Sequence, residues 1–393
     1  MIDLIKEAMN EKTVFIDESK LNTNFVPKKL IHREQEFKDL TRIFLPMLRD
    51  PDFSQKNVLI TGNNGTGKTA LTKRFGISFE EISKDFNFNV KYIHANCRLK
   101  KSNYIIMQHI LHEFLPEFPQ RGFSLYEIIR MLKDIIENQD VHLIITLDEL
   151  NFLDVHDDNL IYILNRLGDE ELRTRGRISI IGIEKNLNFI KGLDLSTLSS
   201  FQYNIIPLMP YSPDQVFDIL KARATMALKP DAITAEILQY IANVTSRSGD
   251  MRYTLELLYR AGKYADQKQL ERINPECIRY AQANTFENFD FNSLSILPEN
   301  EKIMLLSIAR YLKLTKKSYM TITEFKQHYQ LICEEMNKEP LGKSYMYKLL
   351  GHLDECEFIS LEAPRSKKRG EVTKIMVDVI PVEILEAKLE AML

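Results

Sequence analysis

Residues 57–69 read NVLITGNNGTGKT, and this stretch decides the fold. A short apolar run leads into the pattern G-x-x-x-x-G-K-T, which is typical of a phosphate-binding loop between a buried strand and a helix. Its glycines let backbone N–H groups turn inward around phosphate oxygens, and the following helix directs the positive end of its dipole at the same anion. The residues predicted to bind a nucleotide are Gly62, Asn63, Asn64, Gly65, Thr66, Gly67, Lys68, Thr69 and Ala70.

A second stretch, LIITLDELN at residues 143–151, is a buried-strand pattern that ends in two adjacent carboxylates. We expect Lys68 to reach the outer phosphates, and Thr69 and Asp148 to hold Mg²⁺. Glu149 is the candidate base that polarises an attacking water. For the first motif alone, the alternative is a glycine-rich turn with a chance lysine. Two motifs in the right order, each on an expected strand, favour binding of a nucleoside triphosphate with Mg²⁺.

The composition is that of a globular protein of two or three domains. Of the 393 residues, 44% are apolar, and the net charge is only −3, so contacts with nucleic acid must come from local basic patches. The start MIDLIKEAMNEK lacks the apolar core of a signal peptide, and no run approaches about 18 apolar residues. The cysteines form no C-x-x-C pair, which argues against zinc and fits a reducing interior. We therefore expect a cytoplasmic protein without a membrane partner.

Strand and helix patterns alternate up to about residue 207. After an N-terminal arm and an expected helix at His32–Met47, four short runs are rich in β-branched residues and almost free of charge. Such runs predict strands of a parallel sheet that is covered on both faces. They are Val58–Ile60, Val90–Ile93, Leu143–Leu147 and Ile178–Ile183. Residues 1–207 are therefore predicted to form an α/β nucleotide-binding domain.

Beyond residue 207 the pattern becomes helical, with helix starts expected at Ser212-Pro213 and after Gly249. A polar joint at residues 286–300 leads into a third region. This region has expected helices at Glu301–Tyr311, Ile322–Met336 and Gly342–Leu353, and expected strands at Ile359–Ala363 and Val372–Val379 around a basic turn. We predict a helical domain at 208–288 and a separate C-terminal domain at 289–393.

Five further stretches together resemble one family. They are FVPKKLIHREQEFKDL (25–40), VKYIHANCRLKKSNYIIMQHI (90–110), IGIEKNLNF (181–189), MPYSPDQVFDILKARA (209–224) and GDMRYTLELLYRAGKYA (249–265). In that order, they are similar to the entry segment, the strand with its initiator-specific insert, the sensor-one strand, the lid start and the sensor-two helix of archaeal initiators. These initiators are the origin-recognition and cell-division-control-six type, which belong to the AAA+ class and load the replicative helicase.

The resemblance covers nearly the whole chain and implies a fold and a function. The fold is a P-loop AAA+ parallel-sheet core with a helical lid, followed by a winged-helix DNA-binding domain. The implied partners are duplex DNA of a replication origin, paralogous initiator subunits and a replicative helicase, in a nucleoid-associated protein. ATP is then a slow conformational switch, and the chain is a weak Mg²⁺-dependent ATPase at most.

The resemblance also implies roles for residues outside the two motifs. Arg252, at a helix start after Gly249, is expected to close onto the outer phosphate, with a surface arginine as the alternative. Tyr211 and Arg223 are expected near the nucleotide, with ordinary lid packing as their alternative. Candidates for the adenine site are Pro27, His32 and Arg33, for which helix capping or a surface position is the alternative.

Three departures from the family pattern weaken the expectation of hydrolysis, and the one that should matter least is Asn151, where the acidic motif has a further Asp in the family. The sensor-one pair Asn-Asp is replaced by Lys185-Asn186, so that Asn186 takes the water-orienting role from a shifted register or Lys185 acts differently. The arginine that a neighbouring subunit receives is Ser196 in this chain. Because such an arginine contributes about 10³-fold or more to the rate, this chain is expected to be a poor donor. Three arginines lie nearby in the sequence: Arg173, Arg175 and Arg177. They either substitute for the absent arginine or belong to a solvated turn before the sensor-one strand.

The expected helix 342–353 has two distinct faces. Its apolar residues recur at helical spacing and face a core: Met346, Leu349, Leu350 and Leu353. The opposite face and the helix start carry no acid, and this pattern fits a recognition helix in a major groove. The residues predicted to contact DNA there are Lys343, Ser344, Tyr345, Lys348 and His352.

Two basic segments are further candidates for DNA contact. The hairpin tip PRSKKRG (364–370) holds four cations that suit phosphate or minor-groove contact, with a solvated turn as the alternative: Arg365, Lys367, Lys368 and Arg369. Lys100 and Lys101, with Arg98 beside them, form a second patch in the initiator-like insert, for which a solvated loop is the alternative.

Two other classes of protein remain open at this point. One is a signalling or defence ATPase whose winged helix binds protein. The other is a transcription regulator in which the nucleotide is structural. The basic hairpin tip favours the DNA-binding initiator, because a wing that docks on protein does not require four clustered cations.

Overall fold

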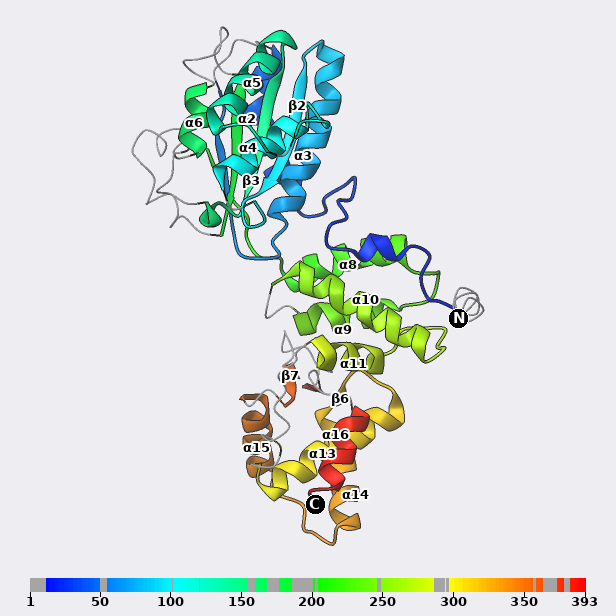
Figure 1. Cartoon of the computed structure of the whole chain (residues 1–393). Coiled ribbons are helices and arrows are strands. Elements are labelled where there is room, and N and C mark those ends of the chain that lie inside the picture. Colours follow the sequence, from blue (N-terminus) through cyan, green and yellow to red (C-terminus); the bar gives the residue numbers. More distant parts are fainter. Residues whose placement is uncertain are drawn as a thin grey trace. The chain divides into compact units, whose positions relative to one another are not determined.

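We analysed a computed structural model of the chain, which describes residues 12–49, 55–100, 102–119, 121–153, 160–167, 177–185, 201, 204–245, 249–285, 294, 297–355, 358–362, 373–377 and 382–393. The chain divides into two compact units (Figure 1). One comprises Val26–Gln215 with Gly249–Met251, and the other comprises Met1–Phe25, Val216–Ser248 and Arg252–Leu393.

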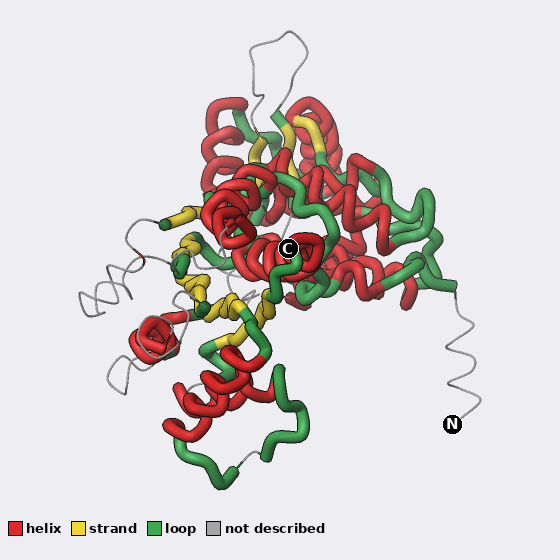
Figure 2. The backbone as a smooth tube through the Cα atoms, turned by 90° about the horizontal axis from the view of Figure 1, so that it is seen from above, coloured by secondary structure: helices red, strands yellow, loops and turns green. Residues whose placement is uncertain are grey.

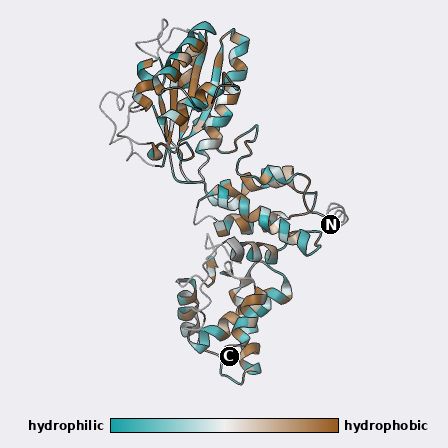
Figure 3. Ribbon diagram, viewed as in Figure 1, coloured by the Kyte–Doolittle hydropathy of each residue, from teal (hydrophilic) through white to brown (hydrophobic). Residues whose placement is uncertain are grey.

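The first unit contains a five-stranded parallel sheet with the strand order β2-β3-β4-β1-β5. Its strands are β1 (Val58–Thr61), β2 (Val90–Asn96), β3 (His142–Asp148), β4 (Ile178–Glu184) and β5 (Ile205–Pro207). All residues of β1, β3 and β4 are buried, and most of them are apolar (Figure 3). The four predicted strands are confirmed. The short edge strand β5 was not predicted.

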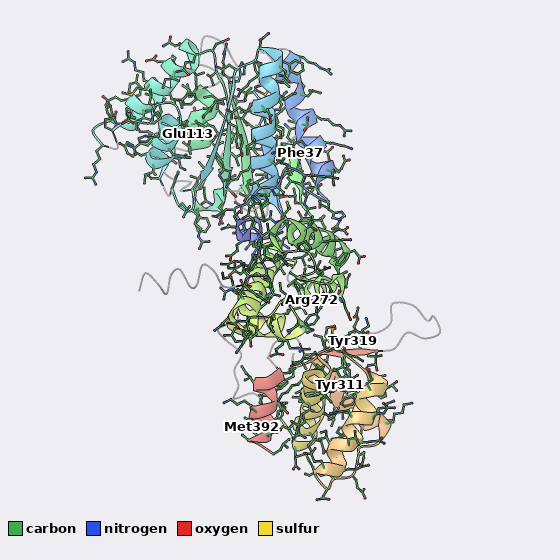
Figure 4. The ribbon with its side chains drawn as sticks, turned by 90° about the vertical axis from the view of Figure 1, so that its right-hand side faces the viewer. Phe37, Glu113, Arg272, Tyr311, Tyr319 and Met392 are labelled. Carbon is green, nitrogen blue, oxygen red and sulfur yellow. The ribbon has the colours of Figure 1, made fainter. Side chains whose placement is uncertain are left out.

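Helices cover both faces of this sheet, as the buried-strand pattern predicts. Helices α2 (Glu34–Arg49) and α3 (Lys68–Ser83) pack through phenylalanines on one face. Helices α4 (Asn103–His112), α5 (Leu125–Asn138) and α6 (Leu160–Arg166) pack on the other. Figure 4 shows Phe37 of α2 and Glu113 after α4 on opposite sides of the sheet. Within β3, Ile144 packs with α2 and α3, whereas Leu143 and Ile145 pack with the opposite set of helices.

The second unit begins with the N-terminal arm, which packs on helices of the predicted lid. These helices are α8 (Pro213–Ala227), α9 (Ala235–Thr245), α10 (Met251–Gln267) and α11 (Pro275–Thr285). Phe15 forms an antiparallel bridge with Leu228, and the backbone N–H of Val14 donates to Asp266 at 2.7 Å. The arm, including the short 3₁₀ helix Glu18–Leu21, therefore contributes to the lid. Helices outweigh strands in the described residues (Figure 2).

The C-terminal part of this unit is a small domain with its own core. Its helices are α13 (Glu299–Thr315), α14 (Ile322–Glu335), α15 (Lys343–Glu355) and α16 (Val382–Glu390), and its antiparallel sheet has the order β6 (Met320–Thr321), β8 (Lys374–Met376), β7 (Ser360–Glu362). This helix and hairpin order confirms the predicted winged helix. Strand β6 and helix α16 were not predicted. Within the described residues, no helix is both long and apolar enough to cross a lipid bilayer.

A fully buried arginine joins the lid to the winged helix. The guanidinium of Arg279, on α11, donates through Nε to the carbonyl oxygen of Val377 at 3.2 Å and through one terminal nitrogen to that of Lys317 at 3.1 Å. The hydroxyl of Tyr240, on α9, donates to the same Val377 oxygen at 3.1 Å. Two lid helices thus hold the backbone directly after β8.

Candidate nucleotide and nucleic-acid sites

The loop between β1 and α3 has the backbone geometry of a phosphate cradle. Gly62, Gly65 and Gly67 have φ angles of 148°, 71° and 91°, which L residues with a side chain rarely adopt. A Cβ atom at Gly62 would lie 2.4 Å from the carbonyl oxygen of Leu208, and one at Gly67 would lie 2.7 Å from the hydroxyl of Tyr211. The glycines predicted from the motif are therefore required by both torsion and space.

Lys68 and the start of α3 complete the cradle. Helix α3 begins at Lys68, its N-cap is Gly67 without a side-chain cap, and its first turn contains no acid. The ammonium of Lys68 donates to the carbonyl oxygens of Gly62 at 2.6 Å and Asn63 at 2.8 Å. A cation thus lies over the loop, beside the positive end of a helix, and this arrangement favours an anion.

Thr69 and Asp148 come together as the two motifs predict. The Thr69 hydroxyl lies 2.7 Å from Oδ2 of Asp148, the last residue of β3, which is 4% exposed. Nε2 of His94, on β2, lies 3.3 Å from the same oxygen. Burial opposes ionisation of this carboxyl, but the contacts with His94 and Thr69 keep the pKa of Asp148 below its usual value. A hydroxyl beside an ionised carboxylate is a donor set that suits Mg²⁺, so these residues fit the implied group.

Glu149 has an unusual backbone conformation and a defined partner. Its φ of 59° and ψ of 53° lie in the left-handed region, which a non-glycine residue adopts at an energetic cost. Asn96, at the end of β2, donates from its side-chain amide to Oε2 of Glu149 at 3.2 Å. The strained turn directs Glu149 away from the strand, and Asn96 orients its carboxylate. Neither His94 nor Asn96 was predicted, because their proximity depends on the pairing of β2 with β3.

Arg33 holds the outer side of the loop, although it was predicted only as a candidate for the adenine site. Its side chain is almost fully buried and donates through Nε to the carbonyl oxygen of Thr66 at 3.0 Å and through a terminal nitrogen to that of Met209 at 2.6 Å. Its guanidinium lies 3.9 Å from the ring centre of Tyr211 and pairs with Glu36 at 3.0 Å. Arg33 therefore ties the phosphate loop to the segment that follows β5.

Three of the remaining nucleotide-site candidates are among the described residues. Pro27 is half-buried before α2. The guanidinium of Arg223 is buried on the arm, where it donates to the carbonyl oxygens of Asn22 at 2.9 Å and Phe25 at 3.2 Å, and burial lowers the pKa of Arg223 to about 10. Arg252 is exposed in the first turn of α10. Asn186 and Ser196 lie outside the described residues.

Of the three arginines considered as substitutes for the finger, only Arg177 is described. Its side chain is 10% exposed and pairs with Asp140, at the start of the sheet. Because Arg177 is buried and paired, its side chain is not available to a neighbouring subunit. It is therefore a poor substitute for the family's arginine, whose position Ser196 occupies in this sequence. Arg173 and Arg175 lie outside the described residues.

Helix α15 has the two faces that the sequence predicts. Met346, Leu349, Leu350 and Leu353 are buried in the core of the winged helix. The opposite face is exposed and consists of Lys343, Ser344, Tyr345, Tyr347, Lys348 and His352. Lys100 is half-buried after β2. The other basic candidates lie outside the described residues: Lys101, Arg365, Lys367, Lys368 and Arg369.

Family models match three successive parts of the chain. They are an AAA domain over residues 49–189, a Cdc6 AAA+ ATPase-type lid domain over residues 217–283, and a CDC6 C-terminal winged helix domain over residues 292–387. Their order along the chain is that of the sheet, the lid helices and the small C-terminal domain described above.

The chain is similar over nearly its whole length to curated relatives and to solved structures. ORC1-type DNA replication protein 2 of Saccharolobus solfataricus is 30% identical over 382 residues, which cover 95% of this chain and 92% of the relative. Cdc6p of Pyrobaculum aerophilum has a TM-score of 0.84 at 27% identity, over 96% of this chain and 98% of that one. The Aeropyrum pernix ORC1 protein, solved in complex with DNA, has a TM-score of 0.64 at 26% identity, over 97% and 98% of the two chains.

Proposed function

The chain belongs to the ORC1/Cdc6 family of DNA replication initiators, and from this premise we propose that it binds duplex origin DNA under the control of ATP. The exposed face of α15 carries the DNA part of this proposal. Lysine, serine, tyrosine and histidine side chains line that face, and they are donors that suit base edges and phosphates. A relative of 26% identity was solved with DNA, which supports the same reading. We divide the chain into a core (1–207), a lid (208–288) and a winged helix (289–393).

ATP and Mg²⁺ are the proposed cofactors of the core. Backbone N–H groups of the loop 62–67 and the ammonium of Lys68 would hold the phosphates, and Thr69 with Asp148 would hold the metal. Bound ATP supplies a phosphoanhydride bond and a charged outer phosphate that the protein can sense. The contact between the Met251 N–H and the Gly65 carbonyl oxygen, at 3.3 Å, supports a sensing role for the start of α10, where Arg252 follows.

Hydrolysis is proposed to be slow, so that ATP acts as a switch. Glu149, oriented by Asn96, is the proposed base that takes a proton from the attacking water. The water-orienting group of sensor one is replaced by Lys185-Asn186, and the finger position is Ser196. A weak ATPase at most is therefore expected. A paralogous initiator subunit that supplies an arginine, and a replicative helicase recruited at the origin, are the proposed partners.

A footprint on DNA from the source genome, titrated with salt in the presence of ATP or ADP, tests this function. We expect protection of a discrete duplex site that responds to the nucleotide. Uniform binding along all sequences, or no binding, would contradict origin recognition. It would favour a winged helix that binds protein, in a signalling or defence ATPase. A nucleotide-independent footprint at promoters would instead favour the transcription regulator.

A further inference from the structure

A buried carboxylate lies beneath the exposed face of α15. Glu301, in the first turn of α13, is 2% exposed. Its Oε1 lies 2.9 Å from Nδ1 of His352, in the last turn of α15. Its Oε2 is buried and has no hydrogen-bond partner among the described residues. The residues are 51 positions apart, so the pair connects two helices of the winged helix.

This geometry makes His352 the principal partner of a costly buried charge. Removing a carboxylate from water is unfavourable unless it is paired and hydrogen-bonded. Because only one oxygen of Glu301 has a hydrogen bond among the described residues, this buried carboxyl group depends on the imidazole of His352 for its pairing. Conversely, the carboxylate fixes the position of that ring. The position of Glu301 also suits the helix dipole, since an acid is favoured at the start of α13.

The His352 imidazole contacts the buried carboxylate through Nδ1, and part of the ring is exposed to solvent. The His352 side chain is 50% exposed, whereas that of Glu301 is 2% exposed. His352 lies one helical turn beyond Lys348 and two beyond Ser344, on the face predicted to enter a major groove. A ring bound at Nδ1 loses little rotational freedom when it meets a ligand, because that freedom is already restricted in the unbound protein.

We propose that Glu301 is a positioning residue for DNA recognition, which holds the His352 ring in a fixed orientation for a hydrogen bond to a base edge in the major groove. This inference rests on the proposed DNA-binding function and extends it to a residue that does not touch DNA. It makes His352 a determinant of sequence discrimination. A carboxylate that only stabilises the fold would not affect discrimination between DNA sequences, whereas the proposed role of Glu301 requires such an effect.

The chain provides a matched control in the same helical turn. Glu299 also lies in the first turn of α13, but it is 61% exposed and pairs with Lys338, which is not on α15. Glu299→Gln therefore removes the same charge from the same turn without altering the support of His352. Glu301→Asp keeps the charge but withdraws the carboxylate by one methylene, and it serves as a second variant if Glu301→Gln does not fold.

The experiment measures Kd of the full-length protein for its footprinted duplex and for a random duplex of equal length. We expect Glu301→Gln and His352→Gln each to lower the ratio of the two affinities about tenfold, within the range for one base contact. The double variant should be no worse than either single variant, because both changes remove the same interaction. Glu299→Gln should keep the wild-type ratio, and Glu301→Asp should lose discrimination in a protein that remains folded.

The outcomes separate this inference from the function on which it rests. If the wild-type protein itself fails to prefer its site, the proposed origin recognition is wrong and the inference fails with it. If the wild type discriminates and His352→Gln does too, His352 does not read DNA. If only His352→Gln loses discrimination, while Glu301→Gln or Glu301→Asp keeps it, Glu301 has a structural role alone. The last two outcomes overturn the inference and leave the DNA-binding function intact.

Discussion

The hydroxyl of Thr69 lies 2.7 Å from a carboxylate oxygen of Asp148, although the two residues are 79 positions apart. Thr69 lies in the first turn of α3, and Asp148 is the last residue of β3. Parallel strands end at one edge of the sheet, and α3 begins at that edge, so the topology brings the two motifs together. The topology thereby places a hydroxyl and a carboxylate together beside the glycine loop at residues 62–67.

Replacing Lys68 with alanine should abolish measurable ATP binding. The lysine is the cation that lies over the phosphate loop, and its present acceptors are backbone carbonyl oxygens of that loop. Removing it deletes the direct charge contact with the outer phosphates without cutting into the core. Isothermal calorimetry with Mg²⁺-ATP tests this, with circular dichroism as the control for folding. Unchanged ATP affinity in a folded Lys68→Ala protein would mean that the loop is not the nucleotide site.

Replacing Glu149 with glutamine should keep ATP binding and abolish hydrolysis. The change removes the proposed base but leaves Thr69 and Asp148 in place. Loss of a general base typically costs about 10²–10⁴-fold in rate. The wild-type rate without a partner should itself lie below about 1 s⁻¹, the lower end of the usual range for enzymes. A phosphate-release assay at saturating ATP measures both. Glu113→Gln, an exposed acid of the same unit, is the control.

Replacing Arg33 with glutamine should loosen the phosphate loop and lower stability. The carbonyl oxygens of Thr66 and Met209 lose their charged donor, and at the buried oxygen of Thr66 this loss costs about 1–3 kcal/mol. We expect the free energy of unfolding to fall by about 2 kcal/mol or more, and ATP affinity to weaken. Urea denaturation and calorimetry measure the two effects. Arg42→Gln, on the helix α2 that follows Arg33 and with a side chain that is 70% exposed, should change stability by less than about 0.5 kcal/mol. Equal losses of stability in Arg33→Gln and Arg42→Gln would contradict the role of Arg33 in holding the phosphate loop.

Local signals in the sequence were enough for the strands β1 to β4, the phosphate loop and the two faces of α15. Each depends on residues close together in the chain, such as glycines at fixed spacing or apolar residues at helical spacing. Strand β5 was not predicted, because three residues ending in Pro207 give too little pattern. The partners of Asp148 and Glu149 on β2 depend on strand pairing, which an isolated sequence does not specify. The same holds for the positions of Arg33 and Glu301.

Replacing Arg279 with methionine should destabilise the junction of the lid and the winged helix. Arg279 is 1% exposed, and its guanidinium donates to the carbonyl oxygens of Lys317, which precedes β6, and Val377, which follows β8. Its removal leaves Glu276 and two backbone acceptors without this donor, and disruption of a buried charged pair typically costs about 3–5 kcal/mol. Tyr240→Phe removes one hydrogen bond and should cost only about 1 kcal/mol.

Urea denaturation of the full chain measures both changes at Arg279 and Tyr240. The control is Arg260→Met on α10, because Arg260 is 43% exposed and pairs with Glu256, which is 40% exposed. That control should shift stability by less than about 1 kcal/mol. An Arg279→Met protein as stable as the control would show that the buried arginine does not hold the two parts together.

Replacing the four cations of the hairpin tip with alanine should weaken binding to all duplexes and flatten its salt dependence. Arg365, Lys367, Lys368 and Arg369 lie outside the described residues, so this prediction depends on their clustering between β7 and β8 in the sequence. Each phosphate contact adds about −0.9 to the slope of log affinity against log salt concentration, so losing several should reduce that slope by about two to four units. Sequence discrimination should be largely retained, in contrast to changes at Lys348 and His352 on α15.

A charge-matched control separates the tip from a general loss of positive charge. Alanine at four exposed cations around the start of α2 changes the net charge equally and should leave the salt slope unaltered: Lys28, Lys29, Lys38 and Arg42. Fluorescence anisotropy at several salt concentrations gives the slopes directly. A tip variant with the full wild-type slope would exclude the hairpin as a phosphate contact. The phosphates would then be neutralised elsewhere, and the insert around Arg98 and Lys100 would be the next segment to replace, because it carries the other basic patch of the sequence.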